Sequence, residues 1–245
     1  MNPLHDLRVA AGFLTRVPVG DVSAGGDRPV RMARAVPWFP VVGLAVGALE
    51  GGVFVGLLEV VSPPVAAAVA VTVALLVTGA FHHDGLADVA DAFGGGWTRE
   101  QRFEILKDSR LGTYGTAALA MALIIEVAAI SALDGLEAFS ALVVAHALGR
   151  AMAVAAMVLA PTAGDGMGAS YMADLSVLRA MAGVVVGLAA NAFLFPGHPL
   201  AALGAGAVMA ALVVVLAVRK IGGINGDVLG AVHVVTMLAV LVSAT

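Results

Sequence analysis

Residues Ala138–Ala160 read AFSALVVAHALGRAMAVAAMVLA, an apolar run in which His146 and Arg150 are the only ionisable groups. A helix needs about 20 apolar residues to cross the hydrocarbon core of a bilayer, and this run is long enough. Six further segments are apolar over similar lengths, although the second and the last of the set are short. The seven are about Val36–Val61, Val65–Phe81, Thr116–Leu133, Ala138–Ala160, Val177–Phe195, Leu200–Val218 and Val228–Val242. The sequence therefore predicts an all-α, polytopic integral membrane bundle of about seven transmembrane helices.

The composition agrees with a single integral membrane domain over residues 1–245. The chain is 60% hydrophobic and 12% charged, and its mean hydropathy of +1.00 is far from that of a soluble domain. It contains no cysteine, which excludes disulfides, zinc–thiolate sites and thiol nucleophiles. The small formal charge of −4, with no basic tract, argues against a nucleic-acid partner. The expected surroundings of the chain are the lipid bilayer.

The connections between the apolar segments indicate an orientation. Three are tight turns broken by Pro or Gly, and these turns contain no Lys or Arg. Three are longer polar loops, at about residues 82–115, 161–176 and 219–227, which hold cations or adjoin them. Because Lys and Arg collect in cytoplasmic loops, we expect the N-terminus and these loops on the inner face. The expected location is the cytoplasmic (inner) cell membrane, with the active face cytoplasmic.

The N-terminal residues 4–19 alternate apolar and charged side chains at near-helical spacing, for example Leu7 and Leu14 against Asp6 and Arg8. This pattern predicts a helix that lies on the inner leaflet of the membrane. An ordinary helix packed on the bundle fits the same pattern.

The segment Phe81–Asp91, FHHDGLADVAD, carries carboxylates at Asp84, Asp88 and Asp91. At 3.6 residues per turn this spacing places all three on one helix face. Like charges so close repel one another unless a cation lies among them, and clustered hard oxygens suit Mg²⁺ shared with a substrate phosphate. We therefore predict a metal site at the three aspartates, with a solvated helix end as the alternative. His82, just before them, is a candidate general base, although a structural role fits it as well.

The stretch Lys107–Gly115, KDSRLGTYG, has the composition of a phosphate-binding loop. Arg110 can grip a phosphate bidentately and Lys107 supplies a point charge. Ser109 offers a hydroxyl, Gly112 lets backbone amides approach a ligand, and Asp108 adds an acid. The alternative is a solvated loop whose cations only follow the positive-inside rule. Upstream, Thr98 and Gln101 have the spacing of a capping box, which predicts a short helix there.

Arg150 lies about ten residues before the end of its segment, roughly 15 Å below the membrane surface. An ionisable group at that depth is costly and usually faces a polar cavity or a partner. We predict a buried anionic ligand site at Arg150, with His146 one turn earlier on the same face. The alternative is a structural ion pair with Glu50 or Glu126.

The last loop, Arg219–Gly230, repeats this combination of cations, glycines and an acid. Gly226 gives backbone freedom for ligand binding, and Asp227 begins the final apolar segment. We expect Asp227 to complete a metal position or orient a nucleophile, although an aspartate at a helix N-terminus needs no further role.

Together these segments resemble the cobalamin synthase family, the adenosylcobinamide-GDP ribazoletransferases (CobS). The matching pieces are Phe13–Val19, Phe39–Leu44, Gly79–Asp91, Lys107–Gly112, Gly149–Arg150 and Gly222–Ala231. They occur in the family's order across nearly the whole chain. The chain departs from the family pattern at Asn225, where threonine is expected, and at His83, where an apolar residue is common.

The resemblance implies an Mg²⁺-dependent transferase that closes the nucleotide loop of cobalamin. Adenosylcobinamide-GDP would donate its phosphocobinamide group to α-ribazole or α-ribazole 5′-phosphate, and GMP would leave. The partners implied are these two substrates and the lipid bilayer. The resemblance also admits an association with other cobalamin-assembly enzymes and leaves the oligomeric state open.

Residue roles follow by position from the resemblance. The three aspartates would hold Mg²⁺ against the diphosphate. Lys107, Arg110 and Arg150 would neutralise charge that develops during the transfer, which is largely a matter of positioning and electrostatics. The proton of the incoming ribose hydroxyl would pass to His82, Asp108 or Asp227.

Three other classes remain as alternatives. A CDP-alcohol phosphotransferase expects arginine where Asp88 stands and a later aspartate pair, and a UbiA-like prenyltransferase expects a second aspartate-rich motif that the second half lacks. A secondary transporter expects repeated halves and polar groups at the membrane midplane. No repeat is visible here, and the polar groups cluster at one face.

Overall fold

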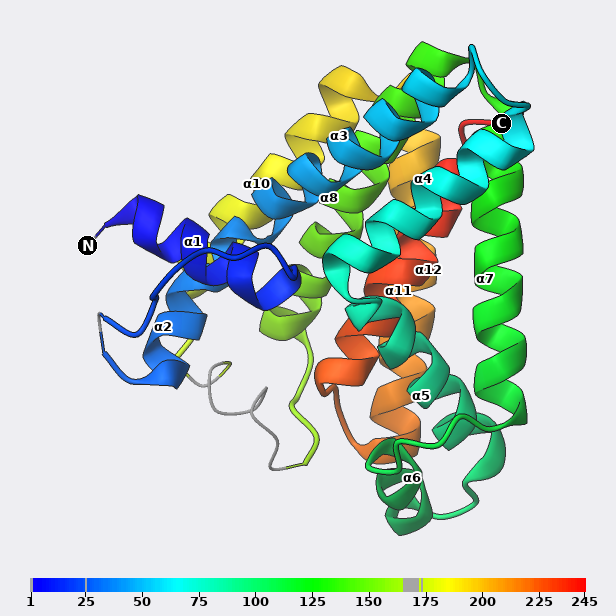
Figure 1. The fold of residues 1–245 in the computed structure, drawn as a ribbon. Helices are drawn as coiled ribbons and strands as arrows, with labels where there is room; N and C mark the ends of the chain where they lie inside the picture. The colour runs from blue at the N-terminus through cyan, green and yellow to red at the C-terminus, as the bar shows by residue number, and fades with distance from the viewer. Residues whose placement is uncertain (1, 25, 165–171, 173) are drawn as a thin grey trace.

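The computed structural model describes residues 2–24, 26–164, 172 and 174–245. These residues are mostly helical and form no strand, which confirms the predicted all-α class (Figure 1). The elements are α1 Pro3–Leu14, α2 Arg28–Ala35, the 3₁₀ turn η1 Val36–Trp38, α3 Phe39–Leu57, α4 Pro63–Thr78, α5 Phe81–Gly95, α6 Arg99–Leu106, α7 Thr113–Ala132, α8 Gly135–Leu159, α10 Val177–Leu194, α11 Pro199–Ile221 and α12 Gly226–Val242.

The membrane-spanning character predicted from hydropathy is confirmed, with a modified count. By length and composition, five stretches of the described chain can each cross a bilayer: Arg28–Leu57, α7, α8, α10 and α11. The predicted second span is α4, which passes the same test of length and composition only together with α5; the two helices are bent by 90° at their junction, as in a broken span or a re-entrant loop. The predicted seventh is α12, an apolar helix of 17 residues. Its shortness is tolerated because much of its surface packs on neighbouring helices instead of lipid.

Helix α8 is the centre of the bundle. In the 18-residue apolar stretch of α8, 78% is buried inside the bundle, against 22–44% in the corresponding stretches of the other four spans. Helix α3 packs along it through Gly43, Gly47 and Gly51, where an added Cβ would collide with the backbone or with Phe139 of α8. Small residues at every fourth position are how membrane helices approach closely. Helices α10 and α12 cover other sides of α8, so its polar side chains are enclosed by protein.

The break between α4 and α5 is made by two residues with left-handed backbone. Gly79 has φ 64° and Ala80 has φ 54°. Gly79 adopts this conformation freely, whereas Ala80 is strained. The Gly79 and Ala80 N–H groups donate to the Leu76 and Leu75 carbonyls at 3.3 and 2.9 Å, so the chain turns with these amides bonded. The bend directs α5 between α7 and α12 (Figure 1).

The predicted polar loops are bonded to one another at one end of the bundle. Thr98 and Gln101 form the predicted capping box at the start of α6. From α6, Arg99 Nε donates to the Ile221 carbonyl (2.9 Å) and Arg102 donates to the Lys220 carbonyl (3.0 Å), where α11 ends. The Ile224 N–H donates to the Pro161 carbonyl at 2.8 Å. Parts of the loops at 82–115, 161–176 and 219–227 therefore share one end, while residues 165–171 and 173 of the middle loop lie outside the described chain. Their cytoplasmic placement stays a prediction.

Helix α1 lies against the bundle. Its buried face includes Val9, Ala10 and Leu14 and packs on α2, η1 and α3. Asp6 lies on the same face, 3.6 Å from Arg34 Nε. Leu4 remains exposed on the other side. The packed arrangement is thus present, and contact with the leaflet stays a prediction.

Candidate functional site

The predicted aspartates lie on α5 beside the start of α12. Asp84 is exposed, Asp88 is half-buried and Asp91 is buried. A Cβ on Gly85 would come within 2.8 Å of the Asp227 carbonyl oxygen, so the glycine of the Asp84-Gly85 pair allows the two helices to meet. This contact brings the Asp227 carboxylate into the electrostatic field of Asp84 and Asp88. The structure therefore adds Asp227 to the predicted cluster.

The chemistry of this cluster fits a magnesium ion. Among the described residues, no cationic side chain bonds to Asp84 or Asp88, so the repulsion between their negative charges is not offset by an ion pair. Several adjacent, solvent-accessible carboxylates without a protein cation suit Mg²⁺, which keeps some of its waters. The aspartate oxygens of the described chain do not form a group of three within 4.8 Å, so side-chain rotation is needed to close them on one ion. Metal binding here stays a prediction.

Asp91 connects the two motifs that the sequence singled out. Its Oδ2 accepts from the Gly112 N–H and its Oδ1 accepts from the Gly115 N–H, both at 2.8 Å. These are N–H groups at the start of α7 that lack a helical partner, so the carboxylate acts as a cap supplied by another helix. The bonds hold the end of the Lys107–Gly112 loop against α5. Asp91 therefore has a visible structural role, and its predicted role as a metal ligand is untested.

The Lys107–Gly112 loop is largely solvent-exposed. Arg110 donates to Asp108 through Nε (3.0 Å) and through a terminal nitrogen (2.6 Å). These bonds lower the pKa of Asp108 to about 2. Asp108 is therefore a weak base at neutral pH, and Arg110 can keep this pairing while it offers its second terminal nitrogen to a phosphate. Lys107 and Ser109 are both exposed.

Arg150 lies deep in the bundle with His82 and Gly226. All three line a cavity of about 30 Å³ whose other walls are mainly apolar and which includes none of the four aspartates. One terminal nitrogen of Arg150 donates to His146 Nδ1 (3.0 Å) and to the His146 carbonyl (3.1 Å). Its Nε and other terminal nitrogen have no hydrogen-bond partner in the described chain. The alternative of an ion pair with Glu50 is not formed directly among the described residues, because His146 lies between the two and its Nε2 is 2.6 Å from Glu50 Oε2. The predicted anionic ligand site at Arg150 stays a prediction.

Sequence reasoning missed two features of this region. Asn225 caps α12 by accepting from the Val228 N–H (3.0 Å), and its amide donates to Asp227 Oδ2 (2.9 Å), so it orients that carboxylate. An asparagine just before an apolar helix is a readable capping signal. The buried His233, whose ring centroid is 4.2 Å from that of His82, was also missed. Its signal was an ionisable residue inside an apolar segment.

Comparisons with known proteins agree on one family. The family model described as cobalamin-5-phosphate synthase matches residues 6–245. An adenosylcobinamide-GDP ribazoletransferase of Bradyrhizobium diazoefficiens is 39% identical over 99% of this chain and 94% of its own length. Proteins of the same name from Mesorhizobium japonicum (39% identical) and Ralstonia nicotianae (38%) cover 99% and 97% of the chain, and 93% of their own lengths. No solved structure gives a significant match.

Proposed function

The chain belongs to the cobalamin-5-phosphate synthase family, and we propose that it performs the family reaction with the carboxylates of α5 and the first turn of α12. It joins adenosylcobinamide-GDP to α-ribazole or α-ribazole 5′-phosphate, which gives adenosylcobalamin or its 5′-phosphate and releases GMP. This is the last step of nucleotide-loop assembly in cobalamin biosynthesis. The observation that carries the proposed site is the contact between Gly85 of α5 and Asp227 of α12, which places the charges of Asp84, Asp88 and Asp227 near one another.

The reaction is a phosphoryl transfer that positioning and charge can accelerate. A ribose hydroxyl of the acceptor attacks the phosphorus next to cobinamide, the bond to the bridging oxygen breaks, and its electron pair leaves with GMP. Asp84 and Asp88 would hold Mg²⁺ in this proposal, with Asp91 at the buried end of the same face. When bound, the ion supplies charge neutralisation for the diphosphate. The phosphate oxygens are bound by Lys107, Ser109 and Arg110, which lie on the loop whose end is hydrogen-bonded to Asp91.

Asp227 is the best placed of the three candidate proton acceptors. Asp108 is paired with Arg110, which keeps the pKa of its carboxyl at about 2 and makes it a weak base. His82 is buried in the cavity with Arg150, away from the aspartates. Asp227 lies at the aspartates, and Asn225 fixes its orientation. In this proposal the hydroxyl proton passes to Asp227.

Phosphotransfer in liposomes tests the proposal. Purified protein would receive adenosylcobinamide-GDP, α-ribazole or its 5′-phosphate, and Mg²⁺, and both the corrinoid product and GMP would be quantified. We expect product that requires Mg²⁺. Asp84→Asn and Asp88→Asn should lose activity by about 100-fold or more, because metal-held charge contributes several kcal/mol to such a transition state. Asp134→Asn is the matched control, because Asp134 only caps α8 at the opposite end of the bundle and asparagine caps equally well.

The possible failures are distinguishable. A folded wild-type protein that makes no product from any of these substrates would overturn the reaction itself. Full activity in Asp84→Asn and Asp88→Asn would leave the reaction in place and overturn the aspartate site.

A further inference from the structure

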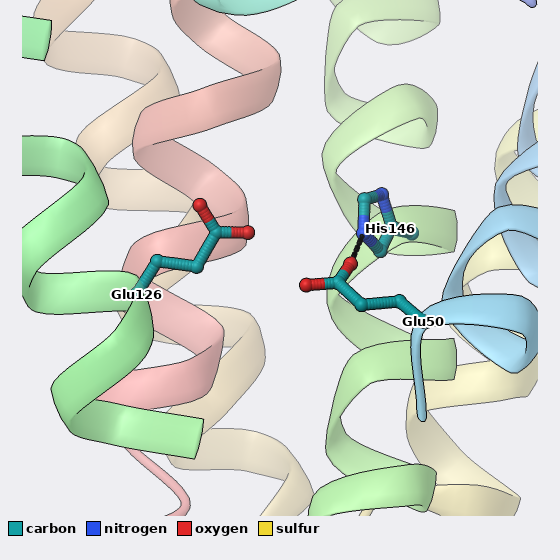
Figure 2. Close-up of side chains that lie close together, drawn as sticks. All are labelled: Glu50, Glu126 and His146. Carbon is teal, nitrogen blue, oxygen red and sulfur yellow. Dashed lines mark hydrogen bonds and ion pairs between the residues drawn. The ribbon is translucent and has the colours of Figure 1, made fainter. Parts of the chain in front are cut away.

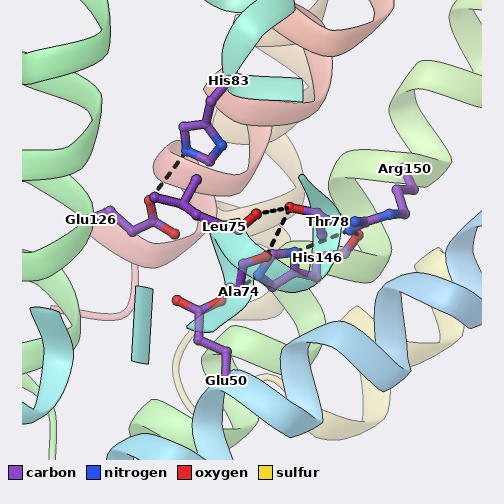
Figure 3. A network of polar contacts seen from close by, with 8 residues as sticks. All are labelled: Glu50, Ala74, Leu75, Thr78, His83, Glu126, His146 and Arg150. Atoms are coloured by element: carbon purple, nitrogen blue, oxygen red, sulfur yellow. Dashed lines mark hydrogen bonds and ion pairs between the residues drawn. The ribbon is translucent and has the colours of Figure 1, made fainter. Parts of the chain in front are cut away.

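A second group of metal-ligand side chains lies inside the bundle. Figure 2 shows Glu50 of α3, Glu126 of α7 and His146 of α8 pointing toward a common point. One ligand atom from each lies within 4.8 Å of the other two, and all three side chains are buried. On α5, His83 Nε2 adds a fourth donor 3.4 Å from Glu126 Oε2 (Figure 3). None of these residues belongs to the aspartate cluster.

The charges of this group do not balance within the described chain. Two carboxylates face each other in a buried environment, and the one permanent cation nearby, Arg150, bonds to His146 instead of to either glutamate. Glu50 Oε1 is buried without a hydrogen-bond partner among the described residues, and Glu126 Oε2 and His83 Nε2 have only their 3.4 Å contact with each other. Buried groups with so few partners are costly, and a bound cation would satisfy all three at once.

A small cavity lies beside three of the four donors. Its volume is about 10 Å³, and it is lined by Glu126, His83 and His146, with Glu50 outside the lining, together with Arg150, two further histidines and residues of α4. A volume near 10–15 Å³ is about what one water molecule occupies. The 3.4 Å between His83 Nε2 and Glu126 Oε2 is close to the separation of two ligands in a tetrahedral site whose metal–ligand bonds are about 2.1 Å.

We propose that Glu50, Glu126 and His146, with His83 as the fourth donor, bind one divalent transition-metal ion of the Zn²⁺ class. Imidazole with carboxylate favours such ions, whereas Mg²⁺ prefers oxygen ligands alone and keeps its waters. The ion would join α3, α5, α7 and α8. Helix α7 packs mainly on α4 and α5 and barely touches α8, so the ion would provide its link to the central helix. This site does not depend on the proposed function.

Binding also requires a local proton shift at His146. Arg150 can only donate, so His146 Nδ1 accepts and Nε2 carries the hydrogen that faces Glu50. An ion on Nε2 would move that proton to Nδ1, which leaves the ring neutral. Arg150 would then give up Nδ1 and keep its bond to the His146 carbonyl at 3.1 Å.

Metal content and thermal stability test the proposal without any activity assay. Protein without a polyhistidine tag would be stripped with a chelator in detergent, offered Zn²⁺, Mn²⁺ or Mg²⁺, desalted and analysed by mass spectrometry for metals. We expect the wild type to retain about one Zn²⁺ per chain and to unfold several degrees higher with it, since an ion bound only by the folded state is stabilising. Mg²⁺ should have neither effect at these residues.

Variants then assign the ion. Glu50→Gln and Glu126→Gln should each lose the retained Zn²⁺ and the rise in Tm, while Glu137→Gln, an exposed glutamate on α8, should keep both. Asp84→Asn with Asp88→Asn should also keep both, because the aspartate cluster is separate. Loss of Zn²⁺ only in the aspartate variants would overturn the assignment. A folded wild type that retains no transition metal would also overturn the proposal, and would mean that the two glutamates share a proton instead. The wild-type measurement gives this answer even where a variant fails to fold.

Discussion

Asp88 and Asp91 stand about one helical turn apart on α5 but have different surroundings. Asp88 faces other carboxylates and has no bonded cation in the described chain. Asp91 uses both oxygens on backbone N–H groups of α7. Replacing a carboxylate that repels its neighbours should raise the stability of the protein or leave it unchanged, whereas replacing one that caps a helix should lower it.

We therefore predict opposite stability effects for two isosteric variants. Asp91→Asn keeps one acceptor and presents an NH₂ group to the second N–H, so unfolding free energy should fall by about 1–3 kcal/mol. Hydrogen exchange at Gly112 and Gly115 should accelerate. Asp88→Asn removes like-charge repulsion, so in the absence of Mg²⁺ its stability should equal or exceed that of the wild type. Thermal unfolding and hydrogen-exchange mass spectrometry measure both, and an Asp91→Asn protein as stable as Asp88→Asn would contradict the capping role.

At the scale of the helices, apolar length and capping signals were readable in the sequence. The seven predicted segments all contain helix, and the Thr98 capping box starts α6 as expected. The sequence did not show that the second segment turns by 90° into the aspartate helix, because that bend depends on a left-handed alanine at position 80. It also did not join Glu50, Glu126 and His146, since a contact among three helices depends on their relative rotation.

The glycines of α3 give a prediction at this scale. Gly47→Ala should destabilise the protein by about 1–3 kcal/mol, because its Cβ would enter the backbone of α8 and overpacking strains the contact. Gly52→Ala on the same helix is the control, because its Cβ meets no atom within 4 Å. Alanine is the better helix former there and should be neutral or stabilising by up to about 1 kcal/mol. Unfolding midpoints in detergent compare the two, and equal effects would contradict close packing of α3 on α8.

At the scale of the whole molecule, the polar loops and the tight turns between the helices lie at opposite ends of the bundle (Figure 1). Bonds between α6, the end of α11 and Pro161 gather the polar loops at one end. Sequence could predict this sorting because the charges of the loops are so unequal. It could not predict which loops would bond to each other, since those bonds use backbone carbonyls.

The orientation of the whole molecule is open to a direct test, because the chain has no cysteine. Ser109→Cys in the polar loops and Leu136→Cys in the first turn of α8 each introduce a single exposed thiol. In intact spheroplasts, a membrane-impermeant maleimide should label Leu136→Cys alone, and both should react after permeabilisation. The reverse pattern would place the aspartates on the outer side of the membrane.

The turn at Gly79–Ala80 is bonded within itself. Because its N–H groups donate to Leu76 and Leu75, the change of direction needs no water molecule or lipid headgroup to complete it. The angle between α4 and α5 is consequently set by hydrogen bonds within the polypeptide and does not depend on the surrounding solvent. Preparations in micelles, nanodiscs or native membranes should therefore share one geometry at the carboxylates, and lipid dependence of activity would report on substrate delivery.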